Sequence, residues 1–164
     1  MQELVALLLF YVGAIFLING VHLLGLMSPK ECGWWNIIIA IFMFANVINF
    51  FRLGEVFFVA QVLLFAFTYL FLGINLLKDL DMRGLGWYCL WVALVTPFVA
   101  KVNFDAGDLR FGLIWIIWGI TWFTFWLILG LGFTRITRGV ALAMIPIGVF
   151  TAWVPGLTMF LGVW

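Results

Sequence analysis

The chain has 164 residues, of which 67% are hydrophobic and only 9% are charged, and its formal net charge at pH 7 is +1. Such an apolar composition cannot cover the surface of a water-soluble protein of this size. A charge near zero, with no run of basic residues, argues against a nucleic-acid partner. The sequence therefore predicts an integral membrane protein.

Six apolar runs follow one another along the chain. A helix needs roughly 20 mostly apolar residues to cross the hydrocarbon layer of a bilayer. Runs of about that length cover residues 3–26, 34–51, 56–77, 85–101, 111–132 and 138–162. The connections between them are short and carry nearly all of the charged residues. We therefore predict an all-α polytopic membrane protein, with six transmembrane helices forming a single domain over residues 1–164.

The first run and the loop charges predict how the chain is inserted. The start, MQELVALLLF, has no basic segment before its apolar part and carries Glu3, so we interpret it as a first span and not a signal peptide. The odd-numbered connections contain Lys30, Lys78, Arg83, Arg135 and Arg138, whereas the even-numbered ones contain Arg52, Lys101 and Arg110. Because basic residues are enriched in cytoplasmic loops, we expect the odd-numbered connections in the cytoplasm and both termini outside.

Reactive side chains are too few or too scattered for an enzyme site. His22 is the one histidine, so neither paired haem ligands nor a multi-histidine metal site can form. Ser28 is the one serine, which excludes a Ser-His-Asp hydrolase. The carboxylates lie near helix ends or in loops, and no lysine lies near the middle of a span, so a proton relay and a Schiff-base site are both disfavoured. A dyad of Cys89 with His22 has no third group to orient it, and Cys32 and Cys89 imply no disulfide framework. We therefore predict no catalysis, no cofactor and no metal.

Neutral polar side chains inside the spans stand out against this apolar background. They are Asn19, Asn36, Asn46, Asn49, Gln61, Thr68, Asn75, Thr96, Thr121, Thr124 and Thr151. In the third span Gln61, Thr68 and Asn75 recur every seven residues and share one helix face, with Phe65 on it and Tyr69 beside it. Such residues commonly hydrogen-bond helices to one another. The pattern fits either this bonding between helices or the polar wall of a solute pathway.

The fifth span carries a stripe of aromatic residues. Phe111, Trp115, Trp118, Trp122 and Phe125 are spaced 4, 3, 4 and 3 residues apart, and at about 100° per residue they form a stripe roughly 80° wide. Membrane tryptophans usually lie at the water interfaces, whereas these lie in the middle of the run. Core packing is the alternative interpretation of the stripe.

Two features of the stripe favour a pathway. Gly119 and Thr121 interrupt the bulky residues, and each indole N–H needs an acceptor when it is removed from water. A slot with flat apolar walls and a few neutral donors and acceptors suits a small, flat, neutral polar molecule. It rejects ions, because nothing in it replaces the lost hydration of a charge.

Five segments, in order, resemble the signature segments of the AmiS/UreI family. They are YVGAIFLING (11–20), LLFAFTYLFLGIN (63–75), GLGWYCLWVAL (84–94), IIWGITWFTFWL (116–127) and FTAWVPG (150–156). The resemblance reaches every span but the second. It implies a six-helix inner-membrane protein that assembles as a hexameric ring, with a solute pathway through the helix bundle of each protomer. It also implies that the channel passes urea or short aliphatic amides to a cytoplasmic urease or amidase.

The resemblance also implies which residues line the pathway. Carried over by position, the constriction residues are Leu9, Val12, Phe16, Asn19, Phe65, Tyr69, Trp115, Trp118 and Trp122. Thr121 stands where the acid-gated branch of the family has a leucine. Ile147 stands where that branch has a glutamate, four residues before the threonine of TAW. The chain is therefore more similar to the amide-channel branch, which is not acid-gated.

These observations lead to the hypothesis of a passive, bidirectional channel for urea or short amides. A planar solute would lie against the rings while its N–H and C=O groups meet Asn19, Thr68, Tyr69, Thr121 or exposed backbone. A coupled transporter of another small neutral solute and a structural subunit of a membrane complex are the alternatives. Urea and acetamide both remain open as permeants.

Acid gating is not expected. Histidine is the side chain whose ordinary pKa lies close to neutral pH, and His22 fits a hydrogen-bonding group at the end of the first span better than a sensor. The connection between the second and third spans offers only Arg52 and Glu55. The connection between the fourth and fifth spans, which is also predicted to lie outside, contains Asp105 and Asp108 but no histidine.

Overall fold

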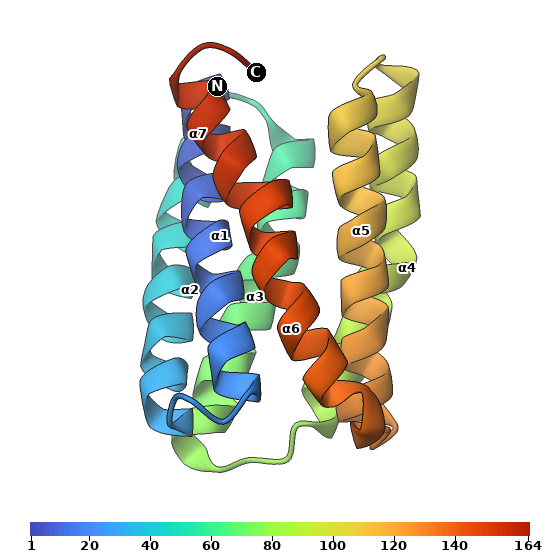
Figure 1. Cartoon of the computed structure of the whole chain (residues 1–164). Coiled ribbons are helices and arrows are strands. Elements are labelled where there is room, and N and C mark those ends of the chain that lie inside the picture. Colours follow the sequence, from blue (N-terminus) through green and yellow to red (C-terminus); the bar gives the residue numbers. More distant parts are fainter. The chain divides into compact units, whose positions relative to one another are not determined.

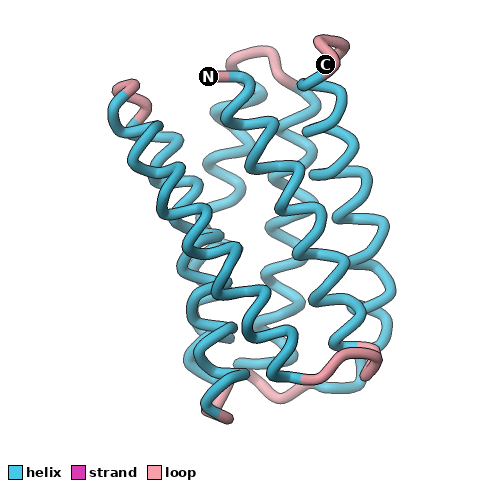
Figure 2. The backbone as a smooth tube through the Cα atoms, turned by 90° about the vertical axis from the view of Figure 1, so that its left-hand side faces the viewer, coloured by secondary structure: helices cyan, strands magenta, loops and turns pink.

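The computed structural model describes all residues, 1–164, and every regular element in it is helical (Figure 1). The first four helices are α1 (Gln2–Leu23), α2 (Pro29–Arg52), α3 (Val56–Lys78) and α4 (Arg83–Asp105). α5 (Leu109–Phe125) continues into a π-helical turn, η1 (Trp126–Gly130). After the 3-10 turn η2 (Thr134–Ile136), the last span is built from α6 (Thr137–Gly148), a second π-helical turn, η3 (Val149–Trp153), and α7 (Val154–Phe160). Figure 2 shows how short the connections between the helices are.

Six helical segments are long and apolar enough to cross a membrane. They are residues 2–23, 29–52, 56–78, 83–105, 109–130 and 134–160, which correspond one to one, and in order, to the six predicted spans. The predicted all-α, six-span fold is therefore confirmed, and the differences are confined to the helix ends.

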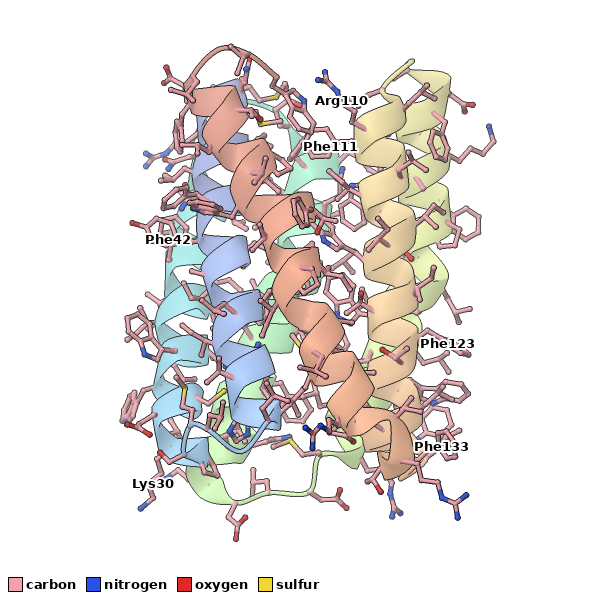
Figure 3. The ribbon with its side chains drawn as sticks, viewed as in Figure 1. Lys30, Phe42, Arg110, Phe111, Phe123 and Phe133 are labelled. Atoms are coloured by element: carbon pink, nitrogen blue, oxygen red, sulfur yellow. The ribbon has the colours of Figure 1, made fainter.

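The second helix begins five residues before the predicted span because a capping box starts it. Ser28 Oγ accepts a hydrogen bond from the Glu31 backbone N–H (3.3 Å), and the Glu31 carboxylate accepts from the Ser28 N–H (3.1 Å). Pro29 occupies the first turn, where its missing N–H costs nothing. Hydropathy alone does not detect this polar first turn, which includes Lys30 at the start of α2 (Figure 3).

The fourth and fifth helices also extend into a segment predicted as a loop. α4 runs on to Asp105, whose carboxylate pairs with Lys101 one turn earlier at 2.6 Å on an exposed surface. Gly107 then takes a positive φ of 80°, and Asp108 Oδ1 caps α5 by accepting from the Phe111 N–H (2.9 Å). The connection between the two helices is thereby reduced to residues 106–108.

The chain divides into two compact units, which are described separately. Unit 1 contains residues 1–80 and 141–164, and unit 2 contains residues 81–140. In unit 1, α1 packs on α2, η3 and α7, and α3 packs on α2. The two chain ends lie at the same end of this unit (Figures 1 and 2). In unit 2, α4 packs along α5 and η1. The single six-helix domain stays a prediction.

Candidate functional site

Glycines on α5 determine which face of that helix is turned toward α4. A Cβ on Gly119 would overlap the Thr96 hydroxyl of α4, and a Cβ on Gly112 would overlap the ring of Phe104. Gly112 and Gly119 are seven residues apart and therefore share one face. At about 100° per residue, the tryptophan stripe lies roughly a quarter turn away from that face. The stripe thus lies to one side of the contact with α4, and the closest approach of α4 does not cover it.

The central residues of the stripe are the most shielded part of α5. Trp115, Trp118 and Trp122 are 3–5% exposed, and the rings of Trp115 and Trp118 meet edge to face, with centroids 5.2 Å apart and an interplanar angle of 77°. The flanking Phe111 and Phe125 are only half-buried. Residues on the opposite side of the helix, Leu113, Ile116, Ile120 and Phe123, are exposed. α5 therefore has an apolar face of the kind that meets lipid and a shielded aromatic face.

Thr121 adds a hydrogen-bond acceptor near this aromatic face. Its side chain is buried, and its hydroxyl donates to the Ile117 carbonyl of its own helix (2.9 Å). A hydroxyl has one donor hydrogen and two acceptor lone pairs. Because the hydrogen is already used, Thr121 can offer a solute only an acceptor.

α3 places its candidate residues on a second shielded face. Phe65, Thr68 and Tyr69 are all buried, and the rings of Phe65 and Tyr69 lie 6.3 Å apart with an interplanar angle of 46°. The Thr68 hydroxyl donates to the Leu64 carbonyl (2.7 Å), and Gln61 Nε2 donates to the Phe57 carbonyl (3.3 Å). These two polar groups of the seven-residue pattern therefore bond to their own helix.

α1 repeats the arrangement of α5. Leu9, Val12, Phe16 and Asn19 are all buried and spaced 3, 4 and 3 residues apart, so they form one face. Roughly a quarter turn from it, Gly13 and Gly20 approach the last span: a Cβ on Gly13 would lie 2.8 Å from the Trp153 backbone N, and one on Gly20 would lie 3.0 Å from the Ala141 carbonyl O.

The eleven predicted pathway residues are thus all buried, at 3–8% exposure. Four of them lie on α1 and three on α3, within unit 1, and four lie on α5, within unit 2. Each set forms a single face of its helix. Their assignment to a solute pathway stays a prediction.

The structure reveals one polar cluster that the sequence analysis did not single out. Asn19 and Asn36, from α1 and α2, form a reciprocal pair of side-chain hydrogen bonds, and the Cys32 thiol donates to Asn19 Oδ1 (3.2 Å). Both asparagines were visible as polar residues within spans. Their pairing depends on how two helices are rotated about their axes, which single-sequence periodicity does not give.

Other polar groups cap helices or stay apart. His22 Nδ1 lies 3.0 Å from the Met27 carbonyl O, across the turn that follows α1. Histidine, cysteine, aspartate and glutamate side chains do not gather in any group of three or more that could hold a metal ion.

Comparison with known proteins finds one family across nearly the whole chain. The model of a family described as "AmiS/UreI family transporter" matches residues 4–163. A Mycolicibacterium smegmatis protein named as an amidate substrates transporter is 35% identical over 162 residues, which cover 95% of this chain and 76% of that protein. The acid-activated urea channel of Helicobacter pylori strain J99 is 27% identical, with 98% of this chain and all of that protein covered.

Solved structures give the same result. The crystal structure of the urea channel from Helicobacter pylori has a TM-score of 0.86 at 27% identity, covering 98% of this chain and 99% of that one. The cryo-electron microscopy structure of the H. pylori urea channel in a closed state has a TM-score of 0.88 at 26% identity, covering 97% and 98%.

Proposed function

We propose that this chain, which belongs to the AmiS/UreI family of transporters, is a passive channel for urea or short aliphatic amides. The family consists of transporters and not of enzymes. Two of its members that are similar to this chain carry names that refer to amidate substrates and to urea. Urea and short aliphatic amides are small, planar and neutral, with N–H donors at one end and a carbonyl acceptor at the other.

The observation that carries the proposal is the combination of shielded aromatic faces with neutral polar groups. Trp115, Trp118 and Trp122 offer flat apolar ring surfaces, and Thr121, beside them, offers an acceptor. On α1, Asn19 offers an amide. Each of these faces suits a planar solute after partial dehydration, because polar contacts replace part of the water that the solute loses.

The position of the charges supports a neutral permeant and passive transport. Arg52 and Lys78 are the last residues of their helices, Arg83 is the first of its helix, and Arg110 lies in the first turn of α5 (Figure 3). The Lys101–Asp105 pair is exposed near the end of α4. No carboxylate lies near the middle of a span, where an ion-coupled transporter needs a site for its coupling ion.

We further propose that the channel is not acid-gated. Residues 53–55 are the whole connection between α2 and α3, and Glu55 is its one acidic residue. The alignment with the acid-activated urea channel spans 197 positions, whereas this chain has 164 residues, so that channel has residues with no counterpart here. His22 is the one histidine, and Ile147 is apolar. The chain thus lacks a cluster of groups that titrate near neutral pH.

The remaining parts of the proposal follow from the family resemblance. Six-helix protomers assemble as a hexameric ring in the lipid of the bacterial inner membrane, with a pathway through each protomer. The excess of basic residues in the odd-numbered connections is the separate reason for proposing that both termini lie outside. A cytoplasmic urease or amidase consumes the solute and maintains the inward gradient. The channel needs no cofactor.

Solute uptake by proteoliposomes tests this proposal. Vesicles containing the purified protein are mixed rapidly with an inward gradient of urea or acetamide, and swelling is followed by light scattering. The proposal predicts entry much faster than in protein-free vesicles, with or without a proton or sodium gradient. Strict dependence on an ion gradient would identify a coupled transporter, and entry no faster than in protein-free vesicles would identify a structural subunit.

A further inference from the structure

The cluster of Asn19, Asn36 and Cys32 is buried between α1 and α2 in unit 1. The three residues are 6%, 0% and 0% exposed, respectively. Asn36 Nδ2 donates to Asn19 Oδ1 at 2.7 Å and to the Cys32 backbone carbonyl at 2.9 Å. Asn19 Nδ2 donates to Asn36 Oδ1 at 3.3 Å, and the Cys32 thiol donates to Asn19 Oδ1 at 3.2 Å.

A backbone carbonyl fixes the direction of these hydrogen bonds. An asparagine amide can turn its oxygen and nitrogen around, and only its surroundings decide between the two orientations. The Cys32 carbonyl is an acceptor that cannot reverse, so the Asn36 group beside it must be the nitrogen. The second hydrogen of that nitrogen then requires an oxygen on Asn19. The backbone of α2 therefore sets the orientation of the Asn36 amide, and the Asn36 amide in turn sets that of the Asn19 amide.

In this orientation Asn19 has one hydrogen-bonding group left for a solute. Its Oδ1 already accepts from Asn36 and from the Cys32 thiol, which uses both lone pairs. Its Nδ2 gives one hydrogen to Asn36 Oδ1, and the protein supplies no acceptor for the other. The remaining N–H is a donor, held in place by the hydrogen bonds that Asn19 makes with Asn36 and Cys32.

We infer that Asn36 is a positioning residue that fixes Asn19 as a hydrogen-bond donor toward the carbonyl oxygen of the permeating solute. This inference rests on the proposed function. A solute with a carbonyl oxygen meets this requirement, as an amide or a urea does.

A pair of aspartate variants tests the polarity without any transport. In Asn36→Asp, the oxygen that replaces Nδ2 faces two acceptors, the Cys32 carbonyl and Asn19 Oδ1, and its one neighbouring donor is the weak Cys32 thiol at 3.4 Å. In Asn19→Asp, the new oxygen faces only Asn36 Oδ1. Asn46→Asp is the matched control, because Asn46 is also buried on α2, at 5% exposure, and its nitrogen makes a single bond, to the Phe42 carbonyl (2.9 Å).

The measured quantity is the thermal denaturation midpoint of each purified variant in mild detergent. We expect Asn36→Asp to lower the midpoint more than Asn19→Asp, and Asn46→Asp to resemble Asn19→Asp, since each additional unpaired buried acceptor is costly. Failure of Asn36→Asp alone to give folded protein is the same result in extreme form. Equal losses in Asn36→Asp and Asn19→Asp, or a larger loss in Asn19→Asp, would overturn the inference.

Selectivity tests the consequence for the solute. Acetamide and thioacetamide differ in the acceptor atom, and sulfur is the weaker acceptor. Their permeability ratio, corrected for protein-free vesicles, is measured for the wild type, Asn36→Leu and the control Asn46→Leu. Loss of one oriented hydrogen bond predicts a fall in the ratio of about threefold to tenfold in Asn36→Leu, and no comparable fall in Asn46→Leu. A structural role alone would lower both permeabilities together.

The cysteine provides a check on the mechanism. Cys32→Ala removes one donor to Asn19 but leaves Asn36 in place, so the permeability ratio should be retained. A fall of the permeability ratio in Cys32→Ala, without a fall of the ratio in Asn36→Leu, would contradict the inference. If the wild type conducts and the ratio does not change in Asn36→Leu, the inference fails while the proposed function stands. If the wild type does not conduct at all, the proposed function fails, and the stability order still decides the polarity.

Discussion

Gly119→Ala is expected to weaken the pairing of α4 and α5. The new methyl group would overlap the Thr96 hydroxyl oxygen and lie 3.1 Å from Thr96 Cβ, whereas ordinary van der Waals contact begins at 3.4 Å. Two responses are open to the protein. Either the helices separate, or Thr96 turns its side chain and gives up the hydrogen bond to the Ala93 carbonyl (2.9 Å).

Both responses cost free energy of similar size. Forcing a methyl group into a well-packed contact costs about 1–3 kcal/mol, and the loss of the threonine hydrogen bond costs about 1 kcal/mol. Alanine offsets part of this, because it favours the helix over glycine by up to about 1 kcal/mol. We therefore expect a net loss of roughly 1–2 kcal/mol, which for a chain of this size lowers the denaturation midpoint by about 2–8 °C.

Two further variants isolate the cause. Gly139→Ala makes the same substitution in α6 where no atom lies within 4 Å, so it measures the helix-propensity gain alone. Thr96→Ala removes the obstructing hydroxyl, so Gly119→Ala should cost less in that background by about 1–2 kcal/mol. The assay is thermal denaturation in mild detergent, followed by tryptophan fluorescence. We also expect urea flux to change in Gly119→Ala, because a shift of α5 at Gly119 would move the adjacent Trp118.

The result that would refute this reasoning is specific. If Gly119→Ala is as stable as Gly139→Ala, α4 and α5 do not approach each other at Thr96 as the structure has it. If Gly119→Ala costs as much in the Thr96→Ala background as in the wild type, the hydroxyl is not the obstacle.

Three other predictions concern the pathway and its regulation. Trp118→Ala and Trp122→Ala should change solute flux or selectivity in protein that still assembles, as checked first by size-exclusion chromatography, because truncating a buried tryptophan can itself cost about 3–5 kcal/mol; wild-type flux in both would place the pathway elsewhere. His22→Gln should conduct nearly as the wild type does, because His22 only meets the Met27 carbonyl at a helix end; a collapse of flux with intact assembly would identify a gate. Urea or amide permeability should vary less than about twofold between pH 5 and pH 7.5 at matched pH on both sides, and a tenfold rise on acidification would refute the absence of acid gating.

The sequence predicts the six spans well because membrane helices need long apolar runs. It predicts the helix ends poorly because polar capping residues determine where the helices begin and end. Hydropathy placed the start of the second span at residue 34, but Ser28 and Glu31 begin the helix at Pro29. α4 likewise stays helical to Asp105, through residues that were predicted as a loop and that include the exposed Lys101–Asp105 pair.

Some features of the candidate site could likewise be predicted from the sequence, and others could not. Helical periodicity places Trp115, Trp118 and Trp122 on one face, and the structure shields that face from solvent. Periodicity cannot place the π-helical turns at 126–130 and 149–153, where the register of the helix face shifts. Nor can it pair Asn19 with Asn36, because that contact depends on the rotation of two helices relative to each other.

Passive conduction is tested most directly by the initial rate of urea and acetamide movement through vesicles that contain this protein alone. The rate is measured in both directions, without any ion gradient, over a wide range of solute concentrations. We predict a rate that exceeds that of protein-free vesicles for at least one of the two solutes. It should rise in proportion to the gradient and be equal for entry and exit. A rate no higher than that of protein-free vesicles, or one that appears only with a proton or sodium gradient, would contradict the account.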